Sequence, residues 1–144
     1  MYKGRETMVY EKIINVKTAQ RTQIINITSQ IDDVVAESGV REGLCYIGSL
    51  HTTAGIIVND NESGLHTDML TLLEKIVPYD PSKYLHNRIG EDNADAHLKL
   101  MLIRMSETLA VSGGKLVLGT WQRIFFVELD GPRQRRVVVK IIGE

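Results

Sequence analysis

The sequence has a single cysteine, no long apolar run and almost no net charge. Because Cys45 is the sole cysteine, neither an internal disulfide nor a thiolate metal cluster can form. The longest apolar runs, such as residues 100–103, are far shorter than the roughly 18 residues that a membrane-spanning helix needs. Seventeen basic and 18 acidic side chains leave a net charge of -1, which argues against a generic nucleic-acid or anionic-membrane binder. We therefore expect neither nucleic acid nor a membrane as a partner.

The N-terminal segment MYKGRETMVYEK also lacks the apolar stretch of a signal peptide, so we expect a cytoplasmic protein. The composition, with 43% hydrophobic and 24% charged residues, is that of an ordinary globular chain. A length of 144 residues fits one domain, residues 1–144. Cys45 lies in the apolar run GLCYIG, where a small buried hydrophobe is the expected role.

Apolar patterning predicts eight strands and three helices. The strands are expected at residues 9–17, 23–27, 44–50, 55–58, 108–111, 115–118, 123–129 and 135–142, and the helices at residues 28–38, 65–76 and 94–105. The first two strands suit a hairpin, and Gly113-Gly114 and Asp130-Gly131 are typical of hairpin turns. A β-rich end that no helix interrupts predicts an α+β fold with a mainly antiparallel sheet or sandwich.

Two predicted strands and one predicted loop have features that suggest a subunit contact or a functional segment. Residues 44–50 and 55–58 are apolar on both faces, which predicts cover on both sides, either within the domain or by a neighbouring subunit. Residues 79–91 show no periodicity, and loops of that length are usually functional or mobile.

Chemically versatile side chains concentrate in two segments. His51 opens HTTAG at the end of a strand, where a rigid element holds a site residue accurately. The segment HNRIGEDNADAHLK combines imidazoles, carboxylates and a lysine within fourteen residues. Histidines suit zinc and carboxylates suit magnesium, and either ion could neutralise a phosphorylated substrate. The structural alternatives are a core role for His97 and helix capping by Asp92 and Asp95.

Two further clusters have equally ordinary explanations. The tetrapeptide at residues 59–62, NDNE, lies between a strand and a helix, where such residues are also common turn formers and caps. The segment GTWQRIFFVELDGPRQRR joins the only tryptophan to several arginines, which could bind a planar ring and a phosphate. Those arginines could equally be solvated or pair across a subunit contact. His66 lies among core positions and is expected to be structural.

Several motifs in one order carry a family resemblance. They are HTTAG with Asn59 and Asn61, then His86, then EDNADAHLK, then GGKLVLGTWQRIFFVELDGPRQRR and the closing IIGE. Together they resemble the YjbQ family, whose members are described as secondary thiamine-phosphate synthases. The resemblance runs from about residue 51 to residue 144, and more loosely through the N-terminal strands.

The resemblance implies a compact α+β subunit with a β-sandwich core, assembled as a homotrimer through orthogonally packed sheets. It also implies a minor activity that joins an aminopyrimidine pyrophosphate to a thiazole phosphate, giving thiamine phosphate and releasing pyrophosphate. A non-catalytic trimer that binds a phosphorylated metabolite is the alternative. A third interpretation leaves the polar clusters at subunit contacts.

The resemblance also implies roles for individual residues. It implies catalytic roles for His51, His86, Glu91, Asp92 and His97, and substrate-binding roles for Asn59, Lys99, Trp121, Gln122, Glu128 and Arg133. A divalent metal, zinc or magnesium, held by His51, His86 and His97 could neutralise the departing pyrophosphate, or Lys99 and Arg133 could do so directly. Trp121 is expected to stack on the pyrimidine. Two positions depart from the family pattern: Asp60 replaces a usual glutamate, and MSETLAV lacks the usual glycine and proline.

Overall fold

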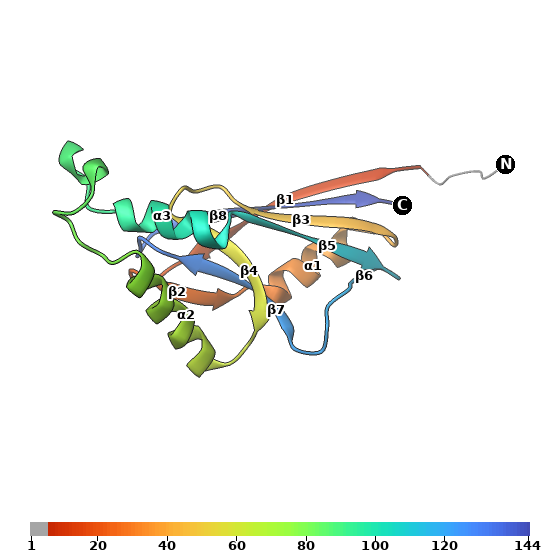
Figure 1. Cartoon of the computed structure of the whole chain (residues 1–144). Coiled ribbons are helices and arrows are strands. Elements are labelled where there is room, and N and C mark those ends of the chain that lie inside the picture. Colours follow the sequence, from red (N-terminus) through yellow and green to blue (C-terminus); the bar gives the residue numbers. More distant parts are fainter. Residues whose placement is uncertain (1–5) are drawn as a thin grey trace.

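The computed structural model describes residues 6–144. The first five residues of the N-terminal segment MYKGRETMVYEK, which lacks the apolar stretch of a signal peptide, lie outside the described residues. Two antiparallel sheets form the frame (Figure 1). The five-stranded sheet has the order β1 (Met8–Lys17), β8 (Gln134–Gly143), β3 (Gly43–Ser49), β5 (Ser106–Ser112) and β6 (Lys115–Leu116), and the three-stranded sheet has the order β2 (Gln23–Asn26), β7 (Gln122–Glu128) and β4 (Ala54–Asp60). Three helices, α1 (Thr28–Ser38), α2 (Ser63–Ile76) and α3 (Ala94–Ile103), and the 3-10 helix η1 (Leu85–Ile89) complete the described chain. The predicted α+β class is confirmed.

The main core lies between the two sheets and α1. Alternation along β8 places Val137, Val139 and Ile141 on the inner face, where all three are fully buried. They belong to one apolar cluster with Ile31 of α1 and Phe126 of β7. Each such side chain contributes about 1.5–3 kcal/mol by leaving water, so this layer supplies most of the stabilisation.

A second, smaller core lies on the other face of the three-stranded sheet. It joins Leu73 of α2 and Ala96 of α3 to Val127 of β7 and to Leu129 just beyond that strand. The three-stranded sheet is therefore covered on both faces within the domain. The outer face of the five-stranded sheet, in contrast, exposes apolar side chains at Val9, Ile13, Leu44 and Ile142. The two-sided cover predicted for residues 55–58 thus comes from the domain itself, whereas one face of β3 stays open.

Two predicted hairpins are wrong and one is confirmed. β1 pairs with β8 and β2 pairs with β7, so β1 and β2 belong to different sheets, and so do β7 and β8. The two connecting segments bond to each other, because the Thr18 amide donates to the Arg133 carbonyl and the Gly131 amide to the Arg21 carbonyl, both at 3.0 Å. The segment from β1 to β2 and the segment from β7 to β8 therefore form two long antiparallel arms, which pass side by side from one sheet to the other. The hairpin at residues 113–114 is confirmed, between β5 and β6.

The loop at residues 79–91 contains η1, which ends at Gly90, whose φ of 93° is a conformation that favours glycine. This segment projects from one end of the molecule (Figure 1). Both of its large aliphatic side chains, Leu85 and Ile89, are exposed. Within residues 6–144, none of the helices has both the length and the apolar character needed to span a membrane.

Candidate functional site

His51 lies in the turn between β3 and β4, where two hydrogen bonds hold it. Its amide donates to the Ser49 hydroxyl at 3.2 Å, and its ring Nε2 accepts from the Arg136 amide on β8 at 2.8 Å. A backbone N–H can only donate, so this Nε2 carries a lone pair and the proton of the neutral ring lies on Nδ1. The side chain is half-buried, which leaves part of the ring open to solvent.

The surroundings of His51 are strongly positive. Partial burial lowers its pKa, and the guanidinium groups of Arg135, Arg136 and Arg133 lower the pKa further, against an opposing effect of Glu128. The ring is therefore neutral near pH 7. The same field that disfavours an imidazolium favours an anion at this position.

A buried ion pair anchors this end of the domain. The Glu128 carboxylate accepts from Arg135 Nε at 2.8 Å and from the Thr18 hydroxyl at 2.8 Å, and a second Arg135 nitrogen contacts its other oxygen. Burial alone would raise the pKa of Glu128, but these hydrogen bonds and that from the Asp130 amide lower it below its ordinary value. Glu128 is fully buried, so it positions Arg135 and presents no oxygen to a ligand.

A second chain of hydrogen bonds reaches His86. The Asn93 amide nitrogen donates to the Asp130 carboxylate at 2.9 Å, and Asn93 Oδ1 lies 3.2 Å from His86 Nε2. Arg133 Nη2 donates to the same Asp130 oxygen at 3.0 Å. The His97 ring packs edge-on against the His86 ring, with 4.9 Å between centroids. Both rings line a cavity of about 320 Å³ between η1 and α3.

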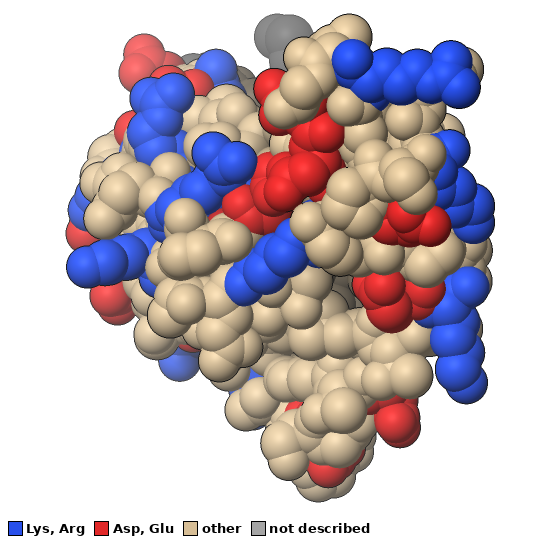
Figure 2. Space-filling view, turned by 90° about the vertical axis from the view of Figure 1, so that its left-hand side faces the viewer, with Lys and Arg blue, Asp and Glu red and all other residues tan. Residues whose placement is uncertain are grey.

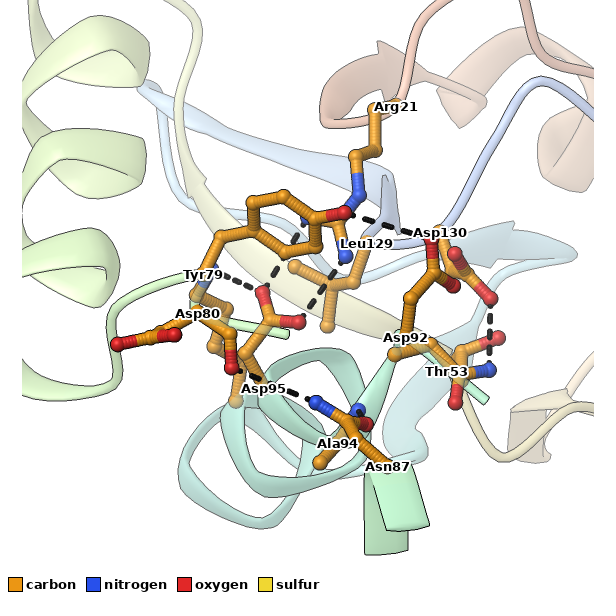
Figure 3. A network of polar contacts seen from close by, with 12 residues as sticks. Arg21, Thr53, Tyr79, Asp80, Asn87, Asp92, Ala94, Asp95, Leu129 and Asp130 are labelled. Carbon is orange, nitrogen blue, oxygen red and sulfur yellow. Dashed lines mark hydrogen bonds and ion pairs between the residues drawn. The ribbon is translucent and has the colours of Figure 1, made fainter. Parts of the chain in front are cut away.

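A third network lies at the same end of the domain (Figure 3). Arg21 binds both oxygens of Asp95 at 3.0 and 3.2 Å, and stacks over the Tyr79 ring at 4.1 Å. Lys99 donates to Asp95 and to Glu74, each at 2.7 Å. Burial alone would raise the pKa of Asp95, but its bonds with Arg21 and Lys99 lower it below the ordinary value.

The sequence predicts that Lys99 neutralises a phosphate, but in the structure Lys99 is not free to do so. It is only 1% exposed, and two carboxylates compensate its charge. Of the two predicted carboxylates before α3, both Glu91 and Asp92 are exposed, and Asp92 accepts from the Tyr79 hydroxyl at 3.3 Å. Figure 2 shows acidic side chains gathered in a hollow of this face, with basic side chains around it.

The remaining predicted residues lie at the opposite end of the three-stranded sheet. Register pairs Ala54 with Glu128 at one end and Asp60 with Gln122 at the other. Six residues at about 3.3 Å each separate these ends by about 20 Å. Asn59 and Trp121, which is 74% exposed, lie at the far end with Gln122, so one chain cannot bring them to the histidines.

The far end has a pocket of its own, of about 360 Å³, lined by Asp60, Glu62, Trp121 and Arg123 among others. Glu62 caps α2 by accepting from the amides of Gly64 and Leu65 at 2.8 and 2.6 Å. The capping interpretation of the segment at residues 59–62 is therefore correct for Glu62.

The predicted metal ligands do not form a binding set within the chain. Across residues 6–144, no three His, Cys, Asp or Glu side chains converge as metal ligands would. His86 and His97 are in contact, but the Nε2 lone pair of His51 already accepts from Arg136. If the His51 ring bound a metal through Nδ1, its proton would have to move to Nε2, facing another N–H. His51 therefore fits a hydrogen-bond donor and not a metal ligand.

Sequence reasoning missed the residues that link the histidines. Asn93 and Asp130 connect His86 to Arg133, but the sequence motifs give Asn93 no site role and Asp130 only a turn. Asn93 does occupy the N-cap position of α3, yet its side chain makes no capping hydrogen bond. Their role depends on contacts 37 residues apart, which no local pattern signals.

The fold and the polar end together define a small α+β domain with a candidate histidine-rich site near the two crossing arms and α3. The chain belongs to the YjbQ family, because the family described as UPF0047 protein YjbQ-like matches residues 12–144. A UPF0047 protein of Methanothermobacter thermautotrophicus is 45% identical over 94% of both chains. YugU of Bacillus subtilis, another UPF0047 protein, is 36% identical over 92% of this chain and 98% of its own.

Solved structures share the fold. A YbjQ-like protein of unknown function from Sulfolobus solfataricus superposes with a TM-score of 0.90 at 41% identity, over 96% of this chain and all of that one. An uncharacterised YjbQ/UPF0047 protein of Clostridium acetobutylicum gives 0.85 at 41% identity, over 90% of this chain and 98% of that one. Family and fold therefore agree, and the relatives' names state no activity.

Proposed function

We propose that the protein is a transferase of the thiamine-phosphate synthase type, with its site at the end of the domain that holds His51, His86 and His97. The observation that carries the proposal is the position of His51 beside Arg133, Arg135 and Arg136, whose charges lower its pKa. Arg135 is buried and paired with Glu128, whereas Arg133 and Arg136 are exposed. Two exposed guanidiniums beside a neutral N–H donor are well suited to bind a pyrophosphate.

The proposed reaction displaces pyrophosphate from a methylene carbon. The thiazole nitrogen forms a C–N bond to the aminopyrimidine methylene, the C–O bond to pyrophosphate breaks, and its electron pair leaves with pyrophosphate. Negative charge grows on the leaving oxygen, so donors already aimed at that oxygen lower the barrier. In this chain His51 Nδ1–H, Arg133 and Arg136 would supply those donors. The proposal does not depend on a divalent metal, whose involvement stays a prediction from the sequence.

The proposal is tested by turnover in purified protein supplied with both phosphorylated substrates. We expect release of pyrophosphate together with thiamine phosphate. His97→Ala should abolish turnover because it removes the ring that packs against His86. Unchanged circular dichroism and melting temperature of the variant would show that its fold is intact, and Asn61→Ala, at an exposed position outside this site, is the matched control. Full activity of His97→Ala would refute the site.

The alternative of a non-catalytic binding protein is an outcome of the same experiment. In that case pyrophosphate raises the melting temperature in proportion to ln(1+[L]/Kd), but no product forms. Binding without turnover would overturn the transferase assignment and leave the anion site standing.

We further propose that the working unit is a homotrimer joined through the outer face of the five-stranded sheet. That face exposes Val9, Leu44 and Ile142, which are 60%, 56% and 47% exposed and lie on adjacent strands. An open apolar sheet face of this kind is typical of subunit contacts. Leu44→Glu should convert the trimer to monomers in sedimentation, whereas Leu72→Glu, at a 57% exposed position on α2, should leave the trimer intact. A wild-type protein that sediments as a monomer would contradict the proposal.

A further inference from the structure

Asn93 has a fixed orientation because its two neighbours differ in what they can bond. The Asp130 carboxylate, paired with the Arg133 guanidinium, can only accept hydrogen bonds. The Asn93 group that faces it at 2.9 Å must therefore be the amide nitrogen. Asn93 Oδ1 then faces His86, and the rotamer is held on both sides. Asn93 and Asp130 are each 9% exposed, so water competes little with the bond between them.

The orientation of Asn93 determines where the proton of His86 lies. An amide oxygen can only accept, so the His86 nitrogen 3.2 Å from it, Nε2, has to donate. The neutral ring then carries its proton on Nε2 and an open lone pair on Nδ1. His51 is held the opposite way, since its Nε2 accepts from the Arg136 amide and its proton lies on Nδ1.

We infer that the two histidines are locked in opposite tautomers, and that Asn93, held by Asp130 and Arg133, is the positioning residue for His86. His51 thereby presents Nδ1–H as a donor, and His86 presents Nδ1 as a proton acceptor. Resting on the proposed function, this arrangement places the donor at the departing pyrophosphate and leaves the acceptor for an N–H of the aminopyrimidine.

The tautomers can be read by NMR in the full-length protein labelled with ¹⁵N-histidine, at a pH where the rings are neutral. Two-bond and three-bond ¹H–¹⁵N correlations identify which ring nitrogen carries the proton, and His→Gln variants assign each ring. His66 is an internal standard for a proton on Nε2, because its Nε2 lies 3.0 Å from the Asp60 carbonyl oxygen. We expect His86 to match the His66 pattern and His51 to show the reverse. A proton on Nε2 of His51, or on Nδ1 of His86, would overturn the inference.

Asn93 is tested by a pair of variants of similar size. Asn93→Leu removes the acceptor, so the Nε2–H resonance of His86 should be lost through exchange with water. Asn93→Gln keeps both the amide donor and the acceptor oxygen and should retain that resonance. Asn61→Leu, outside the site, should leave the His86 signals unchanged. Retention of the protected resonance in Asn93→Leu would exclude Asn93 as the positioning residue.

The result is separate from the outcome of the activity assay. If the tautomers are opposite and no thiamine phosphate forms, the proposed function fails while the inference about the rings stands. If thiamine phosphate forms and the tautomers are alike, the inference fails while the function stands.

Discussion

Replacing Glu128 by glutamine should destabilise the fold more than a loss of one hydrogen bond would. The carboxylate is fully buried, and the partner guanidinium of Arg135 is 4% exposed. Glu128→Gln keeps the shape but leaves a buried cation without its counter-charge, which costs about 3–5 kcal/mol. This is a large part of the roughly 5–15 kcal/mol by which a domain is stable. At about 2.1 cal/mol/K per residue over 144 residues, it lowers the melting temperature by about 10–17 °C.

The measurement is urea denaturation of wild type and variant at one protein concentration. The double variant Glu128→Gln with Arg135→Met should recover most of the loss, because replacing both partners of a buried pair is often nearly neutral. The pH dependence follows from the lowered pKa of Glu128. Its contribution is complete above the ordinary glutamate pKa of about 4.3 and disappears as the pH falls through the lower folded value. A loss under about 1 kcal/mol, or a double variant no better than the single one, would refute this reasoning.

Three further perturbations address other parts of the structure. Lys99→Met should cost about 3 kcal/mol in urea denaturation, since Asp95 then keeps only the Arg21 partner; a neutral effect would contradict the paired state of Lys99. Gly43→Ala should lower the melting temperature sharply, because a Cβ there would lie 2.1 Å from the Ile142 carbonyl oxygen, and an unchanged value would contradict the β3–β8 register. Burial raises the pKa of Cys45 to about 12, so the folded protein should resist iodoacetamide until denaturant is added, and rapid labelling of the native state would show that β3 is not packed as described.

Local patterns predict most of the elements but not the way in which strands pair. The alternation of Val137, Val139 and Ile141 predicts β8, and Gly39 ends α1 at φ 72° as expected. The β1–β2 hairpin prediction fails because strand propensity says nothing about partners. The bond between Thr18 and the Arg133 carbonyl spans 115 residues, which only the folded chain brings together.

The sequence likewise predicts some features of the candidate site and misses others. Sequence motifs identify His51, His86 and His97, which all lie at one end of the domain. They also group Trp121 with these residues, although it lies at the opposite end of the β4–β7 pair, whose two ends are about 20 Å apart. A sequence motif identifies the residues that are typical of the family, but it does not show which of these residues are in contact in the folded chain. The role of Asn93 becomes visible only when the donors and acceptors around it are counted.

The most direct test of the proposed function is a titration of inorganic pyrophosphate into ¹⁵N-histidine-labelled protein. We predict that the Nδ1 proton signal of His51 shifts progressively and saturates, while the His66 signals, at the other end of β4, stay unchanged. Arg136→Ala should weaken this response, because it removes an exposed guanidinium beside the ring. Saturable shifts at His66 with none at His51, or no saturable shift of any histidine, would contradict an anion site at His51.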